Sequence, residues 1–222
     1  MIRNDHLFNH IRNHKLEDLS LLIRHAPRHA IPSGRIGHHD IPLTETGRQM
    51  AYLFGQTLPI DATVRLFHSP IPRCEETAEY IQRGLISNEG SVIQMGQRDF
   101  LDTIGIVDLK QMVMILEQHG RHYLVRQWLD GKLDNTIMRN PHRIVERTLQ
   151  EIIASKREKL SPQRTLDVYI THDLNILAAR EIVLGVKLEN GGWSKYLDGL
   201  VLLHHPKSII VMWEAYVQEI KN

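Results

Sequence analysis

The stretch LSLLIRHAPR, at residues 19–28, decides the fold class. Residues 19–23 form a continuous apolar run with a single serine, which is typical of a strand buried on both faces of a sheet. The run ends in RHAPR (24–28), and a polar loop rich in proline and glycine follows. We therefore expect a buried strand whose carboxyl end carries a histidine and two arginines.

Downstream of this strand, helical and strand patterns alternate. Thr44 suits an N-cap, and the helix after it is expected to end near Leu58, where Pro59 stops it. Gly185 is expected to cap the end of a later helix. The expected strands are 64–68, 91–95, 168–170, 199–204 and 208–213, and the expected helices are 45–58, 73–85 and 174–184, with a helical stretch over 106–160 broken at Gly120, Gly131 and Pro141. This alternation indicates an α/β sheet with helices on both faces.

Length and composition narrow the class of protein. One domain spanning 1–222 is expected, with the helical stretch over about 100–165 as a cap subdomain. A net charge of +1 gives no support to a nucleic-acid binder or a polybasic membrane protein, and a single cysteine excludes an internal disulfide. No run of about 18 apolar residues exists to span a membrane. The polar N-terminus lacks a signal-peptide core, so a cytoplasmic location is expected.

Three polar clusters each follow a predicted strand: RHAPR (24–28), SPIPR (69–73) and THD (171–173). A parallel sheet would bring all three to one edge, where ligands bind in such folds. Arginines offer paired donors that match phosphate oxygens, and a neutral imidazole among them can attack phosphorus. The inventory therefore indicates a phosphoryl group as the ligand.

These motifs resemble the histidine phosphatase superfamily, which includes phosphoglycerate mutases and histidine acid phosphatases. The resemblance lies in LIRHA (22–26), LTETGR (43–48), SPIPRCEETA (69–78) and THD (171–173), in the family's order. It implies a three-layer α/β/α sandwich with a helical cap insertion, and a phosphatase that uses no metal or other cofactor. It also implies that His25 is the nucleophile, forming a phosphohistidine. The phosphate pocket implied by the resemblance consists of Arg24, Arg28, Arg73 and His172.

The resemblance leaves the proton donor open. Acid-phosphatase-like members use the aspartate of a His-Asp pair, here Asp173, whereas mutase-like members use a glutamate after the third strand. The matching stretch, QRDFLD (97–102), contains Asp99 and Asp102 and no glutamate. We expect Asp173 to serve, with Asp102 and Asp99 in reserve, although Asp173 could also simply cap the following helix. Ala26 replaces the usual glycine, and no loss of activity is expected from one methyl group.

Four functions are weighed for the chain. The first is a phosphomonoester hydrolase whose partner is a small phosphorylated molecule or a phosphopeptide. The alternatives are a mutase-type phosphotransferase, a phospho-ligand binding module without turnover, and a histidine-rich metal-binding protein. His6, His10 and His14 are spaced as metal ligands on a helix, but solvated side chains are favoured there.

Several other residues carry expectations of a more structural kind. Cys74 follows Arg73, the reverse of the order in cysteine phosphatases, and is interpreted as a small helix residue. The segment 38–40 (HHD) could border the substrate or be plain loop, and the segment 191–199 could line the pocket. His204 and His205 are expected to be structural. Packing roles are expected for Met112, Met114 and Trp128.

Overall fold

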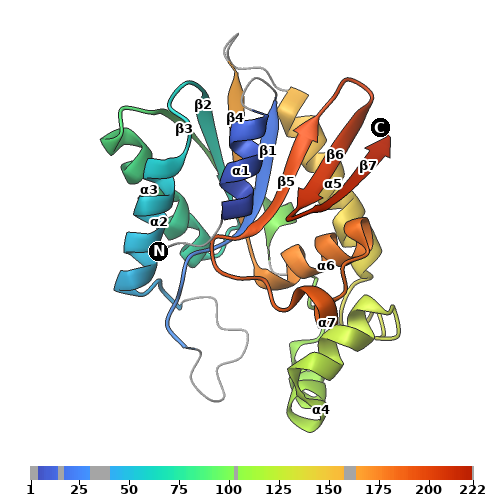
Figure 1. Ribbon diagram of the computed structural model, residues 1–222. Helices are drawn as coiled ribbons and strands as arrows, with labels where there is room; N and C mark the ends of the chain where they lie inside the picture. The colour runs from blue at the N-terminus through green and yellow to red at the C-terminus, as the bar shows by residue number, and fades with distance from the viewer. Residues whose placement is uncertain (1–4, 15–17, 31–40, 103–104, 158–163, 222) are drawn as a thin grey trace.

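A seven-stranded sheet forms the centre of the computed structural model, which describes residues 5–14, 18–30, 41–102, 105–157 and 164–221 (Figure 1). The strand order is β3-β2-β4-β1-β5-β6-β7. The bounds are β1 Leu19–Arg24, β2 Thr63–His68, β3 Ser91–Gln97, β4 Thr165–Thr171, β5 Gly199–His204, β6 Ser208–Trp213 and β7 Tyr216–Lys221. The first four strands in this order run parallel, and β5, β6 and β7 continue the sheet antiparallel.

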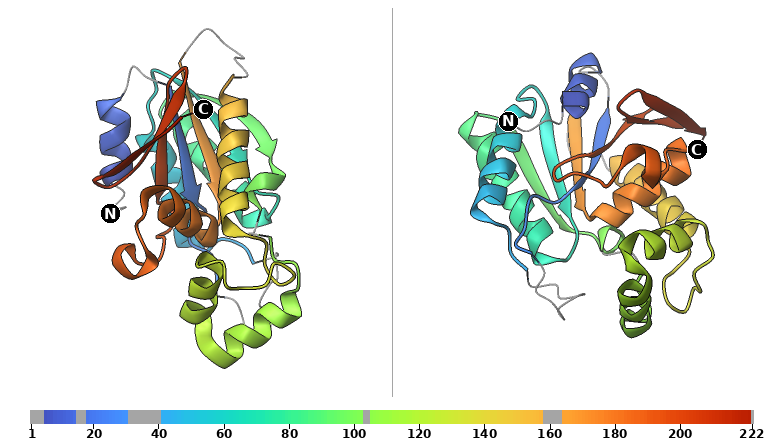
Figure 2. Two further views of the ribbon diagram at one scale, coloured as in Figure 1. Left: turned by 90° about the vertical axis from the view of Figure 1, so that its right-hand side faces the viewer. Right: turned by 60° about the horizontal axis from the view of Figure 1, so that its bottom comes forward.

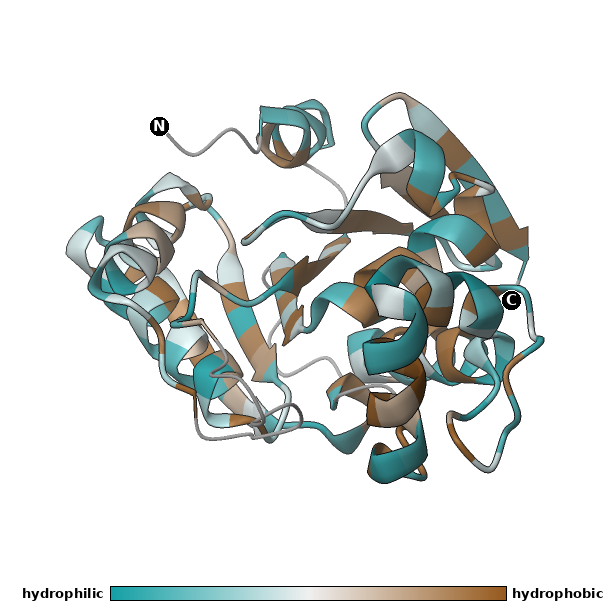
Figure 3. Cartoon of the chain, turned by 90° about the horizontal axis from the view of Figure 1, so that it is seen from below, coloured by the Kyte–Doolittle hydropathy of each residue, from teal (hydrophilic) through white to brown (hydrophobic). Residues whose placement is uncertain are grey.

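The central strands are apolar because helices cover them on both sides. One face packs against α1 (Asp5–Asn13), α2 (Glu45–Thr57) and α3 (Pro72–Ser87), and the other against α5 (Pro141–Arg157) and α6 (Asp173–Leu184) (Figure 2). Successive β1 residues, Leu21 and Leu22, belong to the two different cores, as strand geometry requires. Seen from below, hydrophobic residues concentrate on the strands and on the helices beside them (Figure 3). The α/β sandwich expected from the sequence is confirmed.

The helix after the first loop starts where its sequence signals predict. The side chain of Thr44 accepts a hydrogen bond from the backbone N–H of Gly47, which caps α2. A Cβ on Gly47 would lie 1.9 Å from the carbonyl oxygen of Pro27, so only glycine allows this close approach. The contact fixes the start of α2 against the segment that follows β1.

The predicted helical stretch over 106–160 contains two helices with different positions. α4 (Leu109–Leu129) lies beyond the end of the sheet and is interrupted at Gly120, whose φ of 81° and ψ of 165° are not helical (Figures 1 and 2). α5 begins at Pro141 and packs Val145, Leu149 and Ile152 against the sheet. The breaks at Gly120 and Pro141 are therefore confirmed, and α5 belongs to a layer of the sandwich.

Other expectations have mixed outcomes. Gly185 caps α6 in the left-handed conformation, and Met112 and Trp128 are buried, as predicted. The packing role expected for Met114 is wrong, because this residue is 49% exposed. The sequence does not predict β7, because its residues show only a weak alternation of polar and apolar side chains and most of them are exposed.

The N-terminal histidines also differ from expectation. The prediction of a solvated side chain is wrong for His6, because α1 packs on the sheet and places its ring against Asp198. His10 remains partly exposed, and its Nε2 lies 3.1 Å from the carbonyl oxygen of Glu214. Among the described helices, none combines the length and apolar character needed to cross a membrane.

Candidate active site

The three polar clusters meet at the carboxyl ends of the parallel strands, as predicted. The backbone N–H of His25, after β1, donates to the carbonyl of Thr171 in β4 at 2.9 Å. The backbone N–H of Ser69, after β2, donates to the carbonyl of Ile170 at 3.0 Å. The hydrogen bonding between the strands thus continues for one residue beyond β1 and β2. The side chains that follow therefore lie at the same edge of the sheet.

His25 presents one ring nitrogen to Arg73. Its Nδ1 lies 2.8 Å from the carbonyl oxygen of Ala26, so Nδ1 carries the proton. Its Nε2 then holds a lone pair, which accepts a hydrogen bond from Nε of Arg73 at 3.1 Å. Burial, and after it the charge of Arg73, lowers the pKa of His25 to about 3. The imidazole is therefore neutral at pH 7, as a nucleophile must be.

Arg73 connects both pocket histidines from the first turn of α3. Its Nη2 lies 3.1 Å from Nδ1 of His172, and Nε2 of His172 lies 2.9 Å from Oγ of Ser69. The rings of His25 and His172 have centroids 5.5 Å apart. The two histidines and Arg73 consequently form one hydrogen-bonded group that faces the same space.

Arg24 is held by the segment before β5. Its Nη1 donates to the carbonyl of Ser194 at 2.6 Å, and its guanidinium lies 3.9 Å from the ring centroid of Tyr196. Its buried Nε has no hydrogen-bond partner among the described residues and is a donor still to be satisfied. Arg28 donates to the carbonyl of His29, and its charge adds to the burial that lowers the pKa values of Arg24 and Arg73. Three like charges that act on one another in this way favour an anion between them.

Asp173, the first residue of α6, pairs with arginines on two sides. Its Oδ2 lies 2.5 Å from Arg121 and 3.4 Å from Arg24, and its Oδ1 accepts from the backbone N–H of Leu174. Burial alone would raise the pKa of this carboxyl, but Arg24 and Arg121 outweigh it, and the pKa is lowered. Without a ligand, Asp173 is an ionised carboxylate that anchors Arg24. The N-cap position of α6 is occupied by His172.

The two reserve carboxylates lie in and after η1 (Asp99–Leu101). Asp99 is exposed. Asp102 is half-buried, its carbonyl accepts from Nδ2 of Asn175 at 2.9 Å, and its charge contributes to raising the pKa of Cys74. The Cys74 sulfur lies 3.7 Å from Nε2 of His172, so the charge of Asp102 acts on a thiol beside that histidine.

Cys74 itself is a buried thiol in α3. Burial raises its pKa to about 12, so it is protonated at physiological pH. Its interpretation as a small helix residue agrees with this environment.

Arg121, Trp193 and Tyr196 complete the rim of the site. The sequence predicts that the loop of Trp193 and Tyr196 could line the pocket, but it gives no such indication for Arg121, which does not follow a strand. The guanidinium of Arg121 lies 3.9 Å from the ring centroid of Trp193 while it pairs with Asp173. The signal that the sequence offers for Arg121 is a positive charge within the predicted helical insertion.

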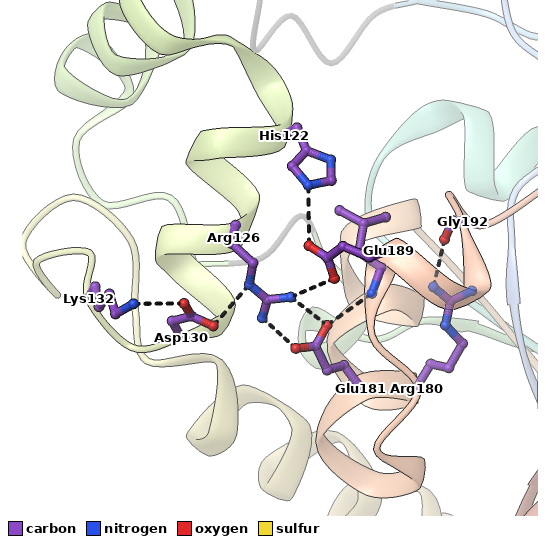
Figure 4. Close-up of polar contacts among 9 residues, drawn as sticks. His122, Arg126, Asp130, Lys132, Arg180, Glu181, Glu189 and Gly192 are labelled. Atoms are coloured by element: carbon purple, nitrogen blue, oxygen red, sulfur yellow. Dashed lines mark hydrogen bonds and ion pairs between the residues drawn. The ribbon is translucent and has the colours of Figure 1, made fainter.

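A charged network anchors the second half of α4 near Arg121 (Figure 4). Arg126 pairs with Glu181 of α6 and Glu189 of α7 (Leu188–Gly191), and His122 lies 3.2 Å from Glu189. Arg180 donates to the carbonyls of Gly191 and Gly192, which precede Trp193. The network therefore fixes the part of the insertion that reaches Asp173.

Metal ligation finds no support in the arrangement of the described side chains. Within the described ranges, no group of three or more His, Cys, Asp or Glu residues is placed to hold a metal ion. The segment 38–40, expected either to border the substrate or to be loop, lies outside the described residues.

Comparisons with known proteins agree with the motifs. The family model of the histidine phosphatase superfamily (branch 1) matches residues 20–195. No curated protein matches the sequence at a significant level.

Three solved structures illustrate the shared fold. Phosphoglycerate mutase from Bacillus anthracis is 16% identical, with 93% of each chain covered and a TM-score of 0.54. The mycobacterial glucosyl-3-phosphoglycerate phosphatase is 16% identical, with 92% of this chain and 97% of that chain covered and a TM-score of 0.58. A second mycobacterial hydrolase is 18% identical, with 90% and 92% covered and a TM-score of 0.60.

Proposed function

Because the chain belongs to the histidine phosphatase superfamily, we propose that it hydrolyses the phosphate monoester of a small molecule, without a metal, through a phosphohistidine at His25. One observation carries the proposal. The unprotonated Nε2 of His25 lies 3.1 Å from Arg73 in a pocket that also holds Arg24. A neutral nitrogen nucleophile beside fixed cations is what transfer of a phosphoryl dianion requires.

The proposed reaction has two displacements. Nε2 of His25 attacks phosphorus, the P–O bond to the leaving group breaks, and a carboxylic acid protonates the departing alkoxide. Water then attacks the phosphohistidine, the same carboxylate accepts a proton from the water, and the P–N bond breaks to release phosphate. Arg73, Arg24 and His172 hold the transferring oxygens, and Arg28 adds positive charge beside them.

The donor in this proposal is Asp173, and Asp102 is the alternative. Asp173 must bind a proton before it can give one, and its pairs with Arg24 and Arg121 oppose that in the ligand-free protein. A phosphate dianion that engages Arg24 weakens one of these pairs and adds a negative charge, and both effects raise the pKa of a nearby carboxyl. Asp102 is half-buried after η1, and its charge acts on Cys74, whose sulfur lies 3.7 Å from Nε2 of His172.

The test of the nucleophile is His25→Ala, with the exposed His142→Ala as the matched control. Hydrolysis of 4-nitrophenyl phosphate should fall to background in the first variant and stay unchanged in the second, with both circular dichroism spectra native. Rapid acid-free quenching of the unchanged chain with labelled substrate should trap a phosphoryl group that acid removes and alkali does not. Normal turnover by His25→Ala would contradict the proposal.

A second candidate function is a phospho-ligand binding module without turnover. The ionised state of Asp173 favours it, because an anchored carboxylate organises Arg24 for binding without supplying a proton. Calorimetric binding of phosphate or vanadate, with no turnover across a panel of sugar phosphates, phosphorylated acids and phosphopeptides, would select it. Isomerisation of phosphoglycerates without release of phosphate would select a mutase instead.

A further inference from the structure

We propose that α1 is a positioning element of the phosphate pocket and that His6 acts on Arg24 through Asp198. The inference rests on the proposed function, because it concerns the same pocket. α1 precedes the region 20–195 that the family model matches, so it is a feature of this chain outside that match.

Apolar contacts fix α1 in place. Leu7 and Ile11 are buried in the core between the sheet and α2, and the Phe8 ring lies 5.3 Å from that of Phe54. The helix therefore lies along the sheet close to β5 (Figure 1). This docking sets where the His6 ring lies.

Both ring nitrogens of His6 are used. Nδ1 accepts from the backbone N–H of Glu214 at 3.3 Å, so the proton lies on Nε2. Nε2 then donates to Oδ1 of Asp198 at 2.6 Å, and the same oxygen accepts from the backbone N–H of Gly199 at 2.8 Å. The carboxylate of Asp198 is thus oriented from α1 on one side and from β5 on the other.

Asp198 is linked to Arg24 by the backbone. The N–H of Arg24 donates to the carbonyl of Asp198, and the N–H of Leu197 donates to the carbonyl of Arg24, each at 3.0 Å. Ser194 and Tyr196, on the same segment, hold the guanidinium of Arg24. Any shift of residues 194–198 therefore moves the donors that are to meet the phosphate.

This segment contains a backbone conformation that needs support. Leu197 has a φ of 55°, in the left-handed region, which is unfavourable for a residue other than glycine because its Cβ crowds the backbone. Such a residue persists only where its surroundings determine its conformation. Glu214, the other residue bonded to His6, also has a left-handed φ, of 50°. His6 is therefore hydrogen-bonded to Asp198, which is the neighbour of Leu197, and to Glu214 itself.

The test compares three variants of the full chain. His6→Phe keeps a ring against Trp213 and removes both nitrogens. His6→Gln keeps a donor at the position of Nε2, and the control Arg12→Ala removes an exposed side chain of α1 that bonds to Asn9. The affinity for inorganic phosphate is measured by calorimetry, and KM and kcat with 4-nitrophenyl phosphate. Thermal melting verifies folding.

His6→Phe should weaken phosphate binding and raise KM by about tenfold, with a smaller effect on kcat, because the displaced donors bind the phosphate group throughout the reaction. His6→Gln should recover most of the affinity, and Arg12→Ala should bind phosphate as the unchanged chain does. If His6→Phe fails to fold, amide hydrogen exchange in the shorter variant His6→Asn decides: exchange at Arg24 and Leu197 should be faster than in the unchanged chain, and an unaltered rate would overturn the inference.

Unaltered phosphate affinity in folded His6→Phe would overturn the inference. If the unchanged chain binds phosphate but does not hydrolyse 4-nitrophenyl phosphate, the proposed hydrolysis is removed, while the affinities of the variants for phosphate would still support the role of His6. An unchanged chain that binds no phosphate would overturn both.

Discussion

Nε of Arg73 donates to Nε2 of His25 at 3.1 Å, so the nitrogen proposed to attack phosphorus is engaged by the residue proposed to hold the phosphate. The same guanidinium reaches His172 through Nη2. A substrate that brings its own oxygens to Arg73 would free the lone pair of His25 at the moment of binding. Activation of the nucleophile and occupation of the pocket are then one event.

Replacing Arg73 by lysine should lower kcat/KM by about 10²–10³-fold, because one ammonium cannot take the place of a planar guanidinium that bonds two histidines and a phosphate. Arg83→Lys, an exposed site on the same helix, is the control and should be neutral. Steady-state kinetics with 4-nitrophenyl phosphate measure both. A loss under fivefold in the Arg73 variant would indicate that its charge alone suffices.

The pH dependence of kcat/KM should identify the proton donor. His25, with a pKa of about 3, is neutral above that pH, and Asp173 as the acid loses its proton above its lowered pKa. If Asp173 donates the proton, kcat/KM should be highest in the acidic range and fall as the pH rises. Asp173→Asn should remove this fall, whereas Asp102→Asn should leave it. A neutral optimum that only Asp102→Asn abolishes would assign the acid to Asp102.

Thiol reagents should leave the activity intact. The Cys74 thiol is buried and its pKa is raised to about 12, so almost none of it is thiolate at pH 7. The native chain should not react with a chromogenic disulfide until it is unfolded, and Cys74→Ala should keep kcat/KM within a few fold. Rapid modification of the folded protein with loss of turnover would give Cys74 a part in catalysis.

His204 should make folding stability depend on pH. Burial, followed by the charge of Lys156, lowers its pKa to about 4, whereas in the unfolded chain it titrates near 6.5. The unfolded state therefore binds more protons between these values, and the free energy of unfolding falls as the pH drops through this window, by at most about 1.4 kcal/mol per pH unit for one group.

Urea denaturation at several pH values between 7 and 4.5 measures this slope. His204→Gln should reduce it, although it also loses the contact of His204 Nε2 with Ser20 at 2.8 Å. His25 contributes a similar slope in both chains. The exposed His142→Gln serves as control, and equal slopes in all three chains would contradict the prediction.

The central strands and the residues at their ends could be predicted from the sequence. Residues 19–23 are apolar throughout, so burial on both faces leaves little choice of structure, and parallel pairing then places His25, Ser69 and His172 together. The N-cap of α2 at Thr44 could likewise be predicted, because it depends only on residues near it in the sequence. These features depend on neighbouring residues or on one rule of sheet geometry.

The features of the site that could not be predicted depend on contacts between residues far apart in the sequence. Arg121 reaches Asp173 only because Arg126 fixes α4 against α6, and no local pattern contains that information. Tyr196 meets Arg24 through a left-handed turn at Leu197, a conformation that leucine does not signal. The ionised state of Asp173 follows from its pairing with Arg24 and Arg121. The sequence therefore predicts this residue as part of the site but not its ionisation state.

The antiparallel direction of β5 has a consequence for how this protein can change. Each parallel strand contributes to the pocket the loop that follows its carboxyl end. Because β5 runs antiparallel to β1, it contributes instead the loop that precedes its first residue. Residues 194–198 are therefore followed by a strand held on both sides, by β1 and β6, so substitutions in this loop can alter recognition while the sheet keeps its register. Sequence variation among close homologues, if it tunes ligand choice, should collect there before it reaches the parallel strands.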